Sequence, residues 1–329
     1  YVVLGSEKTA IIEASHPTFS ESFLEIVEEG LQGRTPDYLI LNHTEPDHSG
    51  AVTALVDKYP GIALVASQAA SIYLKNITNR PELPVRVVRD GDRLSLGDKT
   101  LTFINAPFLH WPDSMFTWLE EERALFTCDF LGCHFCEPEI LDNRITYPSL
   151  YEDALEYYYQ CIFAPFAPYV LKGLDKIKDL DIDCVCPSHG PILTKGCRLE
   201  QAIEKYRKWA APAPKERPLV PLFYCTAYGN TEKLAMSVRE GILEVLPEAD
   251  APVYNMNDIG NADLEKLSAA LNASDAFLIG SPTINRDAVP PVWRLLSHVD
   301  AINIAKRPVA LFGSFGWSGE ALPHVSDRL

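Results

Sequence analysis

The stretch His43-Thr44-Glu45-Pro46-Asp47-His48 decides the fold of the first half of this chain. It follows an apolar run at 37–42 that is typical of a buried strand, and it precedes a segment at 49–56 with helical character. Two imidazoles and two carboxylates therefore share one strand-to-helix turn. A polar helix start would explain one such residue, but not four within six positions. His43 and Glu45 can face one point while Asp47 and His48 face a second. The hexapeptide can therefore serve two metal ions.

Three more candidate ligands follow later predicted strands. His110 ends the segment 101–110, Asp129 closes 123–128, and His189 closes 183–188. Loops that follow strands of α/β proteins collect functional residues. The sequence therefore predicts a binuclear metal site made by His43, Glu45, Asp47, His48, His110, Asp129 and His189.

The H-x-E-x-D-H pattern and the three later positions resemble the metallo-β-lactamase-like domain of the flavodiiron proteins. The resemblance covers nearly the whole chain and implies an α/β fold, a metallo-β-lactamase-like αββα sandwich. It also implies that His43, Glu45 and His110 bind one iron, that Asp47, His48 and His189 bind the other, and that Asp129 bridges the two.

Glu45 is the most diagnostic residue of the pattern. The more widespread version, found in zinc hydrolases, is H-x-H-x-D-H, with a second histidine where this chain has Glu45. Zinc favours nitrogen and sulfur donors, whereas a carboxylate-rich set suits iron. Two alternatives stay open: a zinc-dependent hydrolase of this fold fused to a flavodoxin-like domain, and an electron-transfer module with a structural metal site.

A second domain is expected after a proline-rich linker. The segment 210–218 is rich in alanine and proline, which predicts domains at 1–209 and 219–329. A predicted strand at 219–225 runs through the loop 226–231 into a helix at 232–246. Hydroxyls and backbone N–H groups at such a helix start can bind a phosphate.

The loop 226–231 resembles the T-x-x-x-x-T phosphate loop of flavodoxins, and no lysine stands in the Walker A position of a triphosphate-binding loop. Two further loops follow predicted strands at 275–280 and 308–313, as in a flavodoxin-like doubly wound parallel sheet that binds FMN. Trp317, flanked by small residues, can cover the isoalloxazine ring. The predicted FMN-binding residues are Thr226, Ala227, Tyr228, Gly229, Asn230, Thr231, Ser281, Pro282, Thr283, Ile284, Asn285, Ser314, Phe315, Gly316, Trp317, Ser318 and Gly319.

Composition excludes several classes of protein. A net charge of -16 argues against a nucleic-acid partner, and no apolar run is long enough to span a membrane. The eight cysteines, without a secretion signal, predict reduced thiols in a cytoplasm. We expect Cys133 and Cys136 to be ordinary loop thiols, ahead of a redox pair or a third metal site. His134 is a weak candidate to support the site, and the aromatic run 157–159 predicts core packing from which one phenol can reach it.

The chain starts without an initiator methionine and shows four of the five strands of a flavodoxin sheet. We therefore expect a fragment that lacks an N-terminal segment and the last flavodoxin strand and helix.

The resemblance implies reduction of dioxygen to water, of nitric oxide to nitrous oxide, or both, at a non-haem diiron centre. Electrons would come through FMN from rubredoxin or a similar donor. The metal site and the flavin would be too far apart within one subunit, so the resemblance also implies a head-to-tail homodimer or a dimer of dimers.

Overall fold

The computed structural model describes residues 1–212, 215–299 and 306–329. It divides into two compact units, Tyr1–Ala211 and Pro212–Leu329. The segment 210–218 contains this division. Ala210 still belongs to the last helix of the first unit, and residues 213–214 of the segment lie outside the described residues. No helix among the described residues is long and apolar enough to cross a membrane.

The first unit contains a mixed sheet of five strands. Its outer pair is antiparallel and the remaining pairs are parallel. Three helices cover its outer face, where apolar side chains of the strands and helices form one core cluster. The strands, in spatial order, are β1 (Val2–Leu4), β2 (Thr9–Ile12), β3 (Tyr38–Leu41), β4 (Ala63–Ala66) and β5 (Val85–Val87), and the helices are α1 (Ser20–Leu31), α3 (Val52–Lys58) and α4 (Gln68–Ile77).

A second sheet of six strands packs against the first. All its neighbouring strands are antiparallel except the parallel pair β9 and β10. Its outer face is covered by helices rich in aromatic residues. The strands, in spatial order, are β11 (Leu193–Thr194), β10 (Cys184–Pro187), β9 (Ala124–Cys128), β8 (Met115–Leu119), β7 (Thr100–Asn105) and β6 (Arg93–Ser95), and the helices are α5 (Pro148–Tyr158), α6 (Ala167–Ile177) and α7 (Leu199–Ala210).

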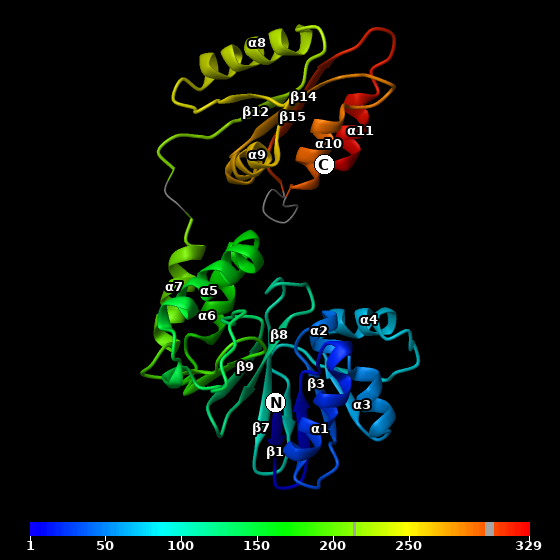
Figure 1. Cartoon of the computed structure of the whole chain (residues 1–329), viewed down its shortest axis with the longest axis vertical. Coiled ribbons are helices and arrows are strands. Elements are labelled where there is room, and N and C mark those ends of the chain that lie inside the picture. Colours follow the sequence, from blue (N-terminus) through cyan, green and yellow to red (C-terminus); the bar gives the residue numbers. More distant parts are fainter. Residues whose placement is uncertain (213–214, 300–305) are drawn as a thin grey trace. The chain divides into compact units, whose positions relative to one another are not determined.

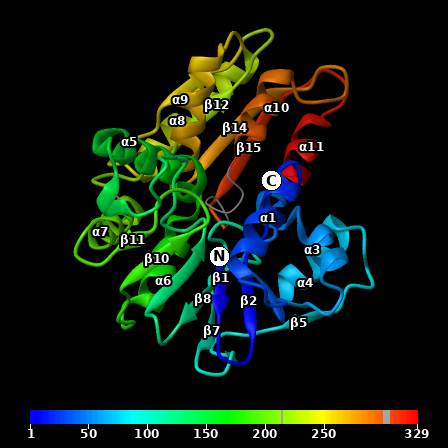
Figure 2. The ribbon, with the colours of Figure 1, turned by 60° about the horizontal axis from the view of Figure 1, so that its bottom comes forward.

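The inner faces of the two sheets share a core in which Ile12 and Ile40 of the first sheet meet Phe103 and Phe126 of the second. Alternating side chains make this possible, because every second residue of a strand points to the same face. The unit is thus a stack of helices, sheet, sheet and helices (Figure 1), and another view shows the same layers (Figure 2). The predicted αββα sandwich is confirmed.

The second unit is a fully parallel sheet of four strands in the order β13-β12-β14-β15. Helix α8 packs on one face through Val238 and Ile242, and three helices pack on the other. This is the doubly wound, flavodoxin-like arrangement that the sequence predicts. The elements are β12 (Leu222–Tyr224), α8 (Asn230–Val245), β13 (Val253–Asn255), α9 (Asn261–Ala273), β14 (Phe277–Pro282), α10 (Pro290–Ser297), β15 (Val309–Ser314) and α11 (Ala321–Arg328).

The first strand of this sheet is shorter than the predicted range 219–225. Pro218 and Pro221 have no backbone N–H to donate, although their carbonyls accept hydrogen bonds from Asp250 and Leu278, and the strand begins only at Leu222. Leu219 forms an isolated bridge to Asp250, and its carbonyl accepts a hydrogen bond from the Asp275 N–H at 2.9 Å.

Candidate functional site

The hexapeptide forms a rigid turn between β3 and the short helix α2 (Pro46–Ser49). Pro46 occupies the first helical position, where its fixed φ favours the helix and its missing N–H costs nothing. The Ser49 hydroxyl donates to the carbonyl of Thr44 at 2.8 Å, and the His48 N–H donates to the carbonyl of Glu45 at 2.9 Å. These bonds fix the directions of the side chains that the turn carries.

A first group of candidate ligands consists of His43, Glu45 and His110. Glu45 Oε2 lies 3.0 Å from His110 Nε2 and 3.4 Å from His43 Nε2. Their donor atoms all lie within 4.8 Å of one another, which is close enough for one metal ion.

A second group consists of Asp47, His48 and His189. Asp47 Oδ2 lies 3.1 Å from His189 Nε2 and 3.5 Å from His48 Nε2. Each group thus combines two residues of the hexapeptide with one later histidine. The first group takes its pair from the start of the hexapeptide and the second from the end, as the spacing predicts.

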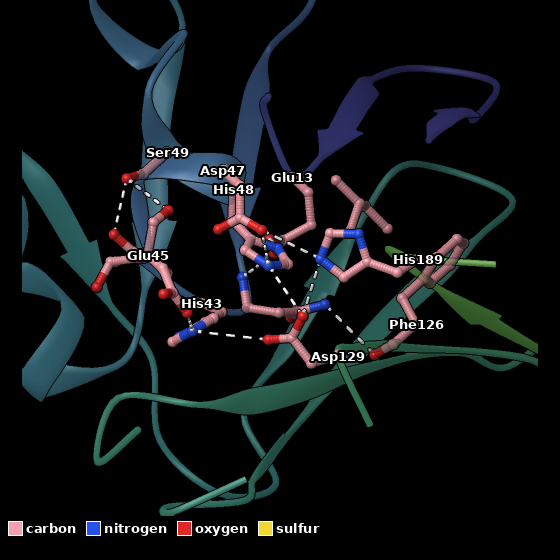
Figure 3. A network of polar contacts seen from close by, with 12 residues as sticks. Glu13, His43, Glu45, Asp47, His48, Ser49, Phe126, Asp129 and His189 are labelled. Carbon is pink, nitrogen blue, oxygen red and sulfur yellow. Dashed lines mark hydrogen bonds and ion pairs between the residues drawn. The ribbon is translucent and has the colours of Figure 1, made fainter. Parts of the chain in front are cut away.

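Asp129 stands between the two groups, directly after β9 (Figure 3). Its Oδ1 lies 3.0 Å from His48 Nε2 and 3.2 Å from His189 Nε2. Its Oδ2 lies 3.6 Å from the Nε2 atoms of both His43 and His110. One carboxylate therefore presents one oxygen to each group, which is the geometry of a bridging ligand.

The segment 101–110 is not one strand, and this prediction is wrong. Strand β7 ends at Asn105, which pairs with Met115 of the antiparallel β8. Pro107 cannot donate a ladder hydrogen bond, so the chain turns back between the strands and His110 lies in that turn.

Two buried carboxylates that the sequence analysis missed hold the histidines in place. Glu13 Oε2 lies 2.8 Å from His48 Nδ1, and Asp113 Oδ2 lies 3.3 Å from His43 Nδ1. Each contact leaves the Nε2 atom of that ring pointing into the site, as in the carboxylate–histidine–metal arrangements of metalloproteins. Asp113 also accepts hydrogen bonds from the N–H and hydroxyl of Thr44 at 2.8 and 2.7 Å.

The missed residues differ in the signal they left. Glu13 directly follows strand β2, as Asp129 directly follows β9, so its position at a strand end could have revealed it. Asp113 lies in the turn after His110, and β7 ends well before it, at Asn105, so no strand end marks its position.

One phenol of the aromatic run 157–159 contacts the site. The Tyr158 hydroxyl donates to Asp129 Oδ1 at 3.1 Å, and burial together with the charge of Asp129 raises the pKa of Tyr158 well above its usual value. Tyr157 is exposed and Tyr159 packs in the core. The ring of His134 lies 4.8 Å from that of Tyr158 and 5.2 Å from that of His189, measured between centroids.

Negative charge dominates the site and attracts cations. Burial lowers the pKa of His43, but hydrogen bonds with Asp113 and Glu45 and the charge of Asp129 outweigh it and raise that pKa to about 9. The pKa of His189 is likewise raised to about 9 against burial, by Asp129 and Asp47. Hydrogen bonding with His110 and then with His43 lowers the pKa of Glu45 to about 2.

The donor set fits iron. It joins imidazole nitrogens with carboxylate oxygens, which suit iron better than the nitrogen and sulfur donors that zinc prefers. Asp47 Oδ1 and Asp129 Oδ2 are buried and make no hydrogen bond among the described residues, so their lone pairs are open to a metal ion. A buried carboxylate oxygen without a partner is costly unless a cation compensates it.

In the second unit, the three predicted loops converge at the carboxyl ends of β12, β14 and β15. Gly229, at φ +77°, turns the chain into the N-terminus of α8. The Thr231 and Ser314 hydroxyls lie 2.9 Å apart, and the Thr283 N–H donates to the carbonyl of Ser314 at 2.9 Å. The Thr226 hydroxyl is buried without a hydrogen-bond partner among the described residues. Hydroxyls and N–H groups at this helix start fit a phosphate.

Two of these loops carry a large aromatic side chain that is exposed to solvent. Trp317 is 85% exposed and Tyr228 is 91% exposed, so neither belongs to a protein core. Exposed aromatic rings of this kind can stack on a flat apolar ligand. A small hollow beside Trp317 is lined by Thr283, Asn285 and by Arg286, which the sequence analysis missed and which pairs with Glu320 at 3.0 Å.

Not every predicted flavin residue presents its side chain to this surface. Ser281 is buried, and its hydroxyl donates to the carbonyl of Pro282 at 2.8 Å. Pro282 ends strand β14, and Ile284 forms a tight bridge with Asp287. Their backbone shapes the loop that carries Thr283 and Asn285.

Comparisons with known proteins agree with both halves of this description. A family model described as "ODP family beta lactamase" matches residues 1–190. "Flavo-diiron protein FprA2" of Clostridium acetobutylicum is 48% identical, over 100% of this chain and 82% of that protein. "Anaerobic nitric oxide reductase flavorubredoxin" of Vibrio vulnificus is 30% identical, over 99% of this chain and 65% of that protein.

Among solved structures, the rubredoxin oxygen:oxidoreductase from Desulfovibrio gigas matches with a TM-score of 0.63 and 27% identity, covering 100% of this chain and 80% of that one. The matches extend over both units. The chain therefore belongs to the flavodiiron proteins, a family of oxidoreductases that carry a diiron centre and FMN.

Proposed function

We propose that this chain reduces dioxygen to water, nitric oxide to nitrous oxide, or both, at a diiron centre held by the seven predicted ligands, with electrons supplied through FMN. The carboxylate of Asp129, with one oxygen toward each ligand group, is the observation that carries the proposal. The printed names of two relatives, an oxygen oxidoreductase and a nitric oxide reductase, support these two gases.

The residues of the first unit have distinct tasks in this reaction. His43, Glu45 and His110 would hold one iron, Asp47, His48 and His189 the other, and Asp129 both. Bound iron supplies the change of oxidation state that a diatomic substrate needs. Glu13 and Asp113 keep His48 and His43 in the orientation that ligation requires.

Protein side chains also control protons and water at the site. The raised pKa of Tyr158 keeps its hydroxyl protonated, so it stays a hydrogen-bond donor beside Asp129. The ring of Trp111 lies 5.1 Å from that of His43, and the ring of Phe163 lies 6.3 Å from that of His110, measured between centroids. These apolar rings limit the access of water to the group that contains His43 and His110.

In the second unit, the hydroxyls of Thr226, Thr231 and Ser314 and the start of α8 would bind the FMN phosphate, and Trp317 would cover the ring. The predicted linker 210–218 would join this domain to the first. The donor would be rubredoxin or a carrier of similar chemistry.

A head-to-tail homodimer, alone or as a dimer of dimers, would bring the flavin of one chain to the irons of the other. An apolar hollow of about 510 Å³ next to Glu45 and His110 supports this arrangement. It is lined by Pro46, Tyr73, Asn76, Ile77, Trp111 and Pro112. Sedimentation should find a dimer or tetramer, and a monomer with full turnover would contradict the proposal.

All eight cysteines are free thiols, which supports a reducing compartment such as the cytoplasm. Cys133 is buried and Cys136 exposed, and neither is part of a predicted metal group.

Metal analysis and stopped-flow oxidation test the function. The proposal expects two irons and one FMN per chain, and rapid oxidation of the reduced protein by O2, by NO, or by both under anaerobic conditions. Zinc content with hydrolysis of thioesters or phosphodiesters would instead support the hydrolase alternative. A reduced protein that reacts with neither gas would leave only the electron-transfer module.

A further inference from the structure

A row of aromatic rings runs from the metal site toward the surface of α7. The Tyr158 hydroxyl contacts Asp129, and its ring lies 6.0 Å from that of Phe163. The Phe163 ring lies 5.7 Å from Tyr206, and Tyr206 lies 5.8 Å from Trp209, all between centroids. The rings therefore form an unbroken path of neighbours.

Tyr159 adds a second connection at the outer end of this row. Its ring lies 5.0 Å from both Tyr206 and Trp209. Tyr206 is the residue through which the contacts from Phe163 reach both Tyr159 and Trp209. We call Tyr158, Phe163, Tyr206, Tyr159 and Trp209 the aromatic relay.

Hydrogen bonding explains the tyrosine at position 158, which donates to Asp129, but not the tyrosines at positions 206 and 159. The hydroxyls of Tyr206 and Tyr159 are buried and make no hydrogen bond among the described residues. An unpaired buried hydroxyl lowers stability, and phenylalanine would avoid that cost. A phenol also differs from a phenyl ring in its filled π orbitals, which lie higher in energy and let an electron tunnel through the ring more readily. Since the Tyr206 hydroxyl has no acceptor among the described residues, it keeps its proton and the ring mediates the transfer without being oxidised.

Trp209 suits the outer end of such a path. It lies in the last turn of α7 and is only partly buried. An indole can lose an electron first and release its N–H proton to water afterwards. Its position at the surface therefore provides both the electron and an outlet for the proton.

We propose that the aromatic relay delivers electrons from Trp209 to the metal site when O2 is reduced there while the flavin is oxidised. This inference rests on the proposed reduction of O2. Reducing O2 to two waters takes four electrons and four protons, and two ferrous ions provide two of the electrons. Trp209 provides the other two when the oxygen of a water molecule bonds to its indole ring, a step that releases two protons. The net products are one water, two ferric ions and a hydroxytryptophan.

The test uses the full chain with oxidised FMN, loaded anaerobically with two ferrous ions and then exposed to O2 in the presence of catalase. Peptide mapping by mass spectrometry should find one added oxygen atom on Trp209. Met236 is 42% exposed and reports any freely diffusing peroxide, because a thioether is easily oxidised. It should stay unmodified. A chain without iron should show no change at either residue.

Tyr206→Phe removes only an unpaired hydroxyl and should fold normally. It should lower the modification of Trp209 several-fold. Tyr157→Phe is the matched control, because Tyr157 neighbours the relay but points to solvent, and it should change nothing. Unmodified Trp209 in the wild-type chain, or equal modification in Tyr206→Phe, overturns the relay if O2 is still consumed. If the fully reduced chain consumes no O2, the proposed function has failed instead.

Discussion

The metal centre and the flavin surface are built in opposite ways. At the metal centre the histidines and Asp129 are mostly buried and each contacts another charged or titratable group. At the flavin surface, Trp317 and Tyr228 are almost fully exposed. The hydrogen bonds there join backbone groups and hydroxyls, such as those of Thr231 and Ser314. One site is preformed, whereas the other leaves much of its apolar surface open.

The difference follows from what each site binds. A metal ion is held only through its few ligand atoms, so hydrogen bonds from neighbouring groups must orient those ligands. A flavin brings a large flat ring, whose burial against aromatic side chains supplies much of the binding energy. Changes at the metal centre should therefore have larger and more local effects than changes at the flavin surface.

The largest effect is expected for Asp129→Ala, because this residue faces both ligand groups. Its loss should remove nearly all iron and gas reduction while FMN stays bound. Elemental analysis and flavin absorbance measure both. Asp153→Ala, an exposed change on α5, is the control. An Asp129→Ala protein that keeps both irons would show that Asp129 does not bridge.

Glu13→Gln and Asp113→Asn should each weaken one side of the centre. Partners of ligating histidines typically contribute about 10–100-fold to metal affinity. Competition with a chelator should show that Glu13→Gln loses the iron at His48 first, and Asp113→Asn the iron at His43. Asp142→Asn changes a buried carboxylate that bonds to Thr194, away from the site, and should leave the affinity unchanged. Equal loss of both irons in each variant would contradict the one-sided assignment.

Thr231→Val tests the flavin side. A hydrogen bond to a charged group contributes about 1.5–3 kcal/mol, so FMN affinity should fall about 10-fold or more while iron content stays constant. Fluorescence titration of the flavin measures the affinity. Ser237→Ala, on the exposed side of the same helix, should have no effect. Unchanged FMN binding in Thr231→Val would place the phosphate elsewhere.

The smallest effect concerns pH in the metal-free chain. The pKa values of His43 and His189 are raised to about 9 from an unfolded value of about 6.5, so their charged forms stabilise the fold. This stability is fully present below pH 6.5 and is lost as the pH rises through about 9. Melting temperatures of the metal-free chain should fall by several degrees over that interval. The iron-loaded chain should not show this fall, because ligation already keeps the rings deprotonated.

Both folds were predictable from the sequence, and so were the seven candidate ligands that the structure brings together. That was possible because four of them share one short turn, and Asp129 and His189 follow strands whose apolar runs are easy to read. Asp113 was not predictable, because its contact with His43 depends on how the turn before β8 meets the end of β3, where the Met115 N–H donates to the carbonyl of Asn42. The predicted strand before His110 was too long, because an antiparallel partner imposes the turn.

At the flavin surface, the loops were predictable from hydroxyls and glycines after strands, but side-chain directions were not. Ser281 turns inward because its hydroxyl bonds to its own loop. Arg286 lines the hollow beside Trp317, and its backbone has a φ of +63°. No sequence pattern predicts this backbone conformation at an arginine.

The position of Asp129 between ligands from both sheets also has a consequence for biosynthesis. His43 and His48 are carried by the first sheet, while Asp129 and His189 follow strands of the second, and His189 follows the next-to-last strand of that sheet. A chain still on the ribosome, with that strand unmade, offers an incomplete second group. Binding of metal at both positions must therefore wait until the chain has been made beyond His189. Once bound, the ions would join two sheets whose shared face holds apolar contacts and the hydrogen bonds of Asn42 with Thr117 and Phe126, so they would add to the stability of a completed fold.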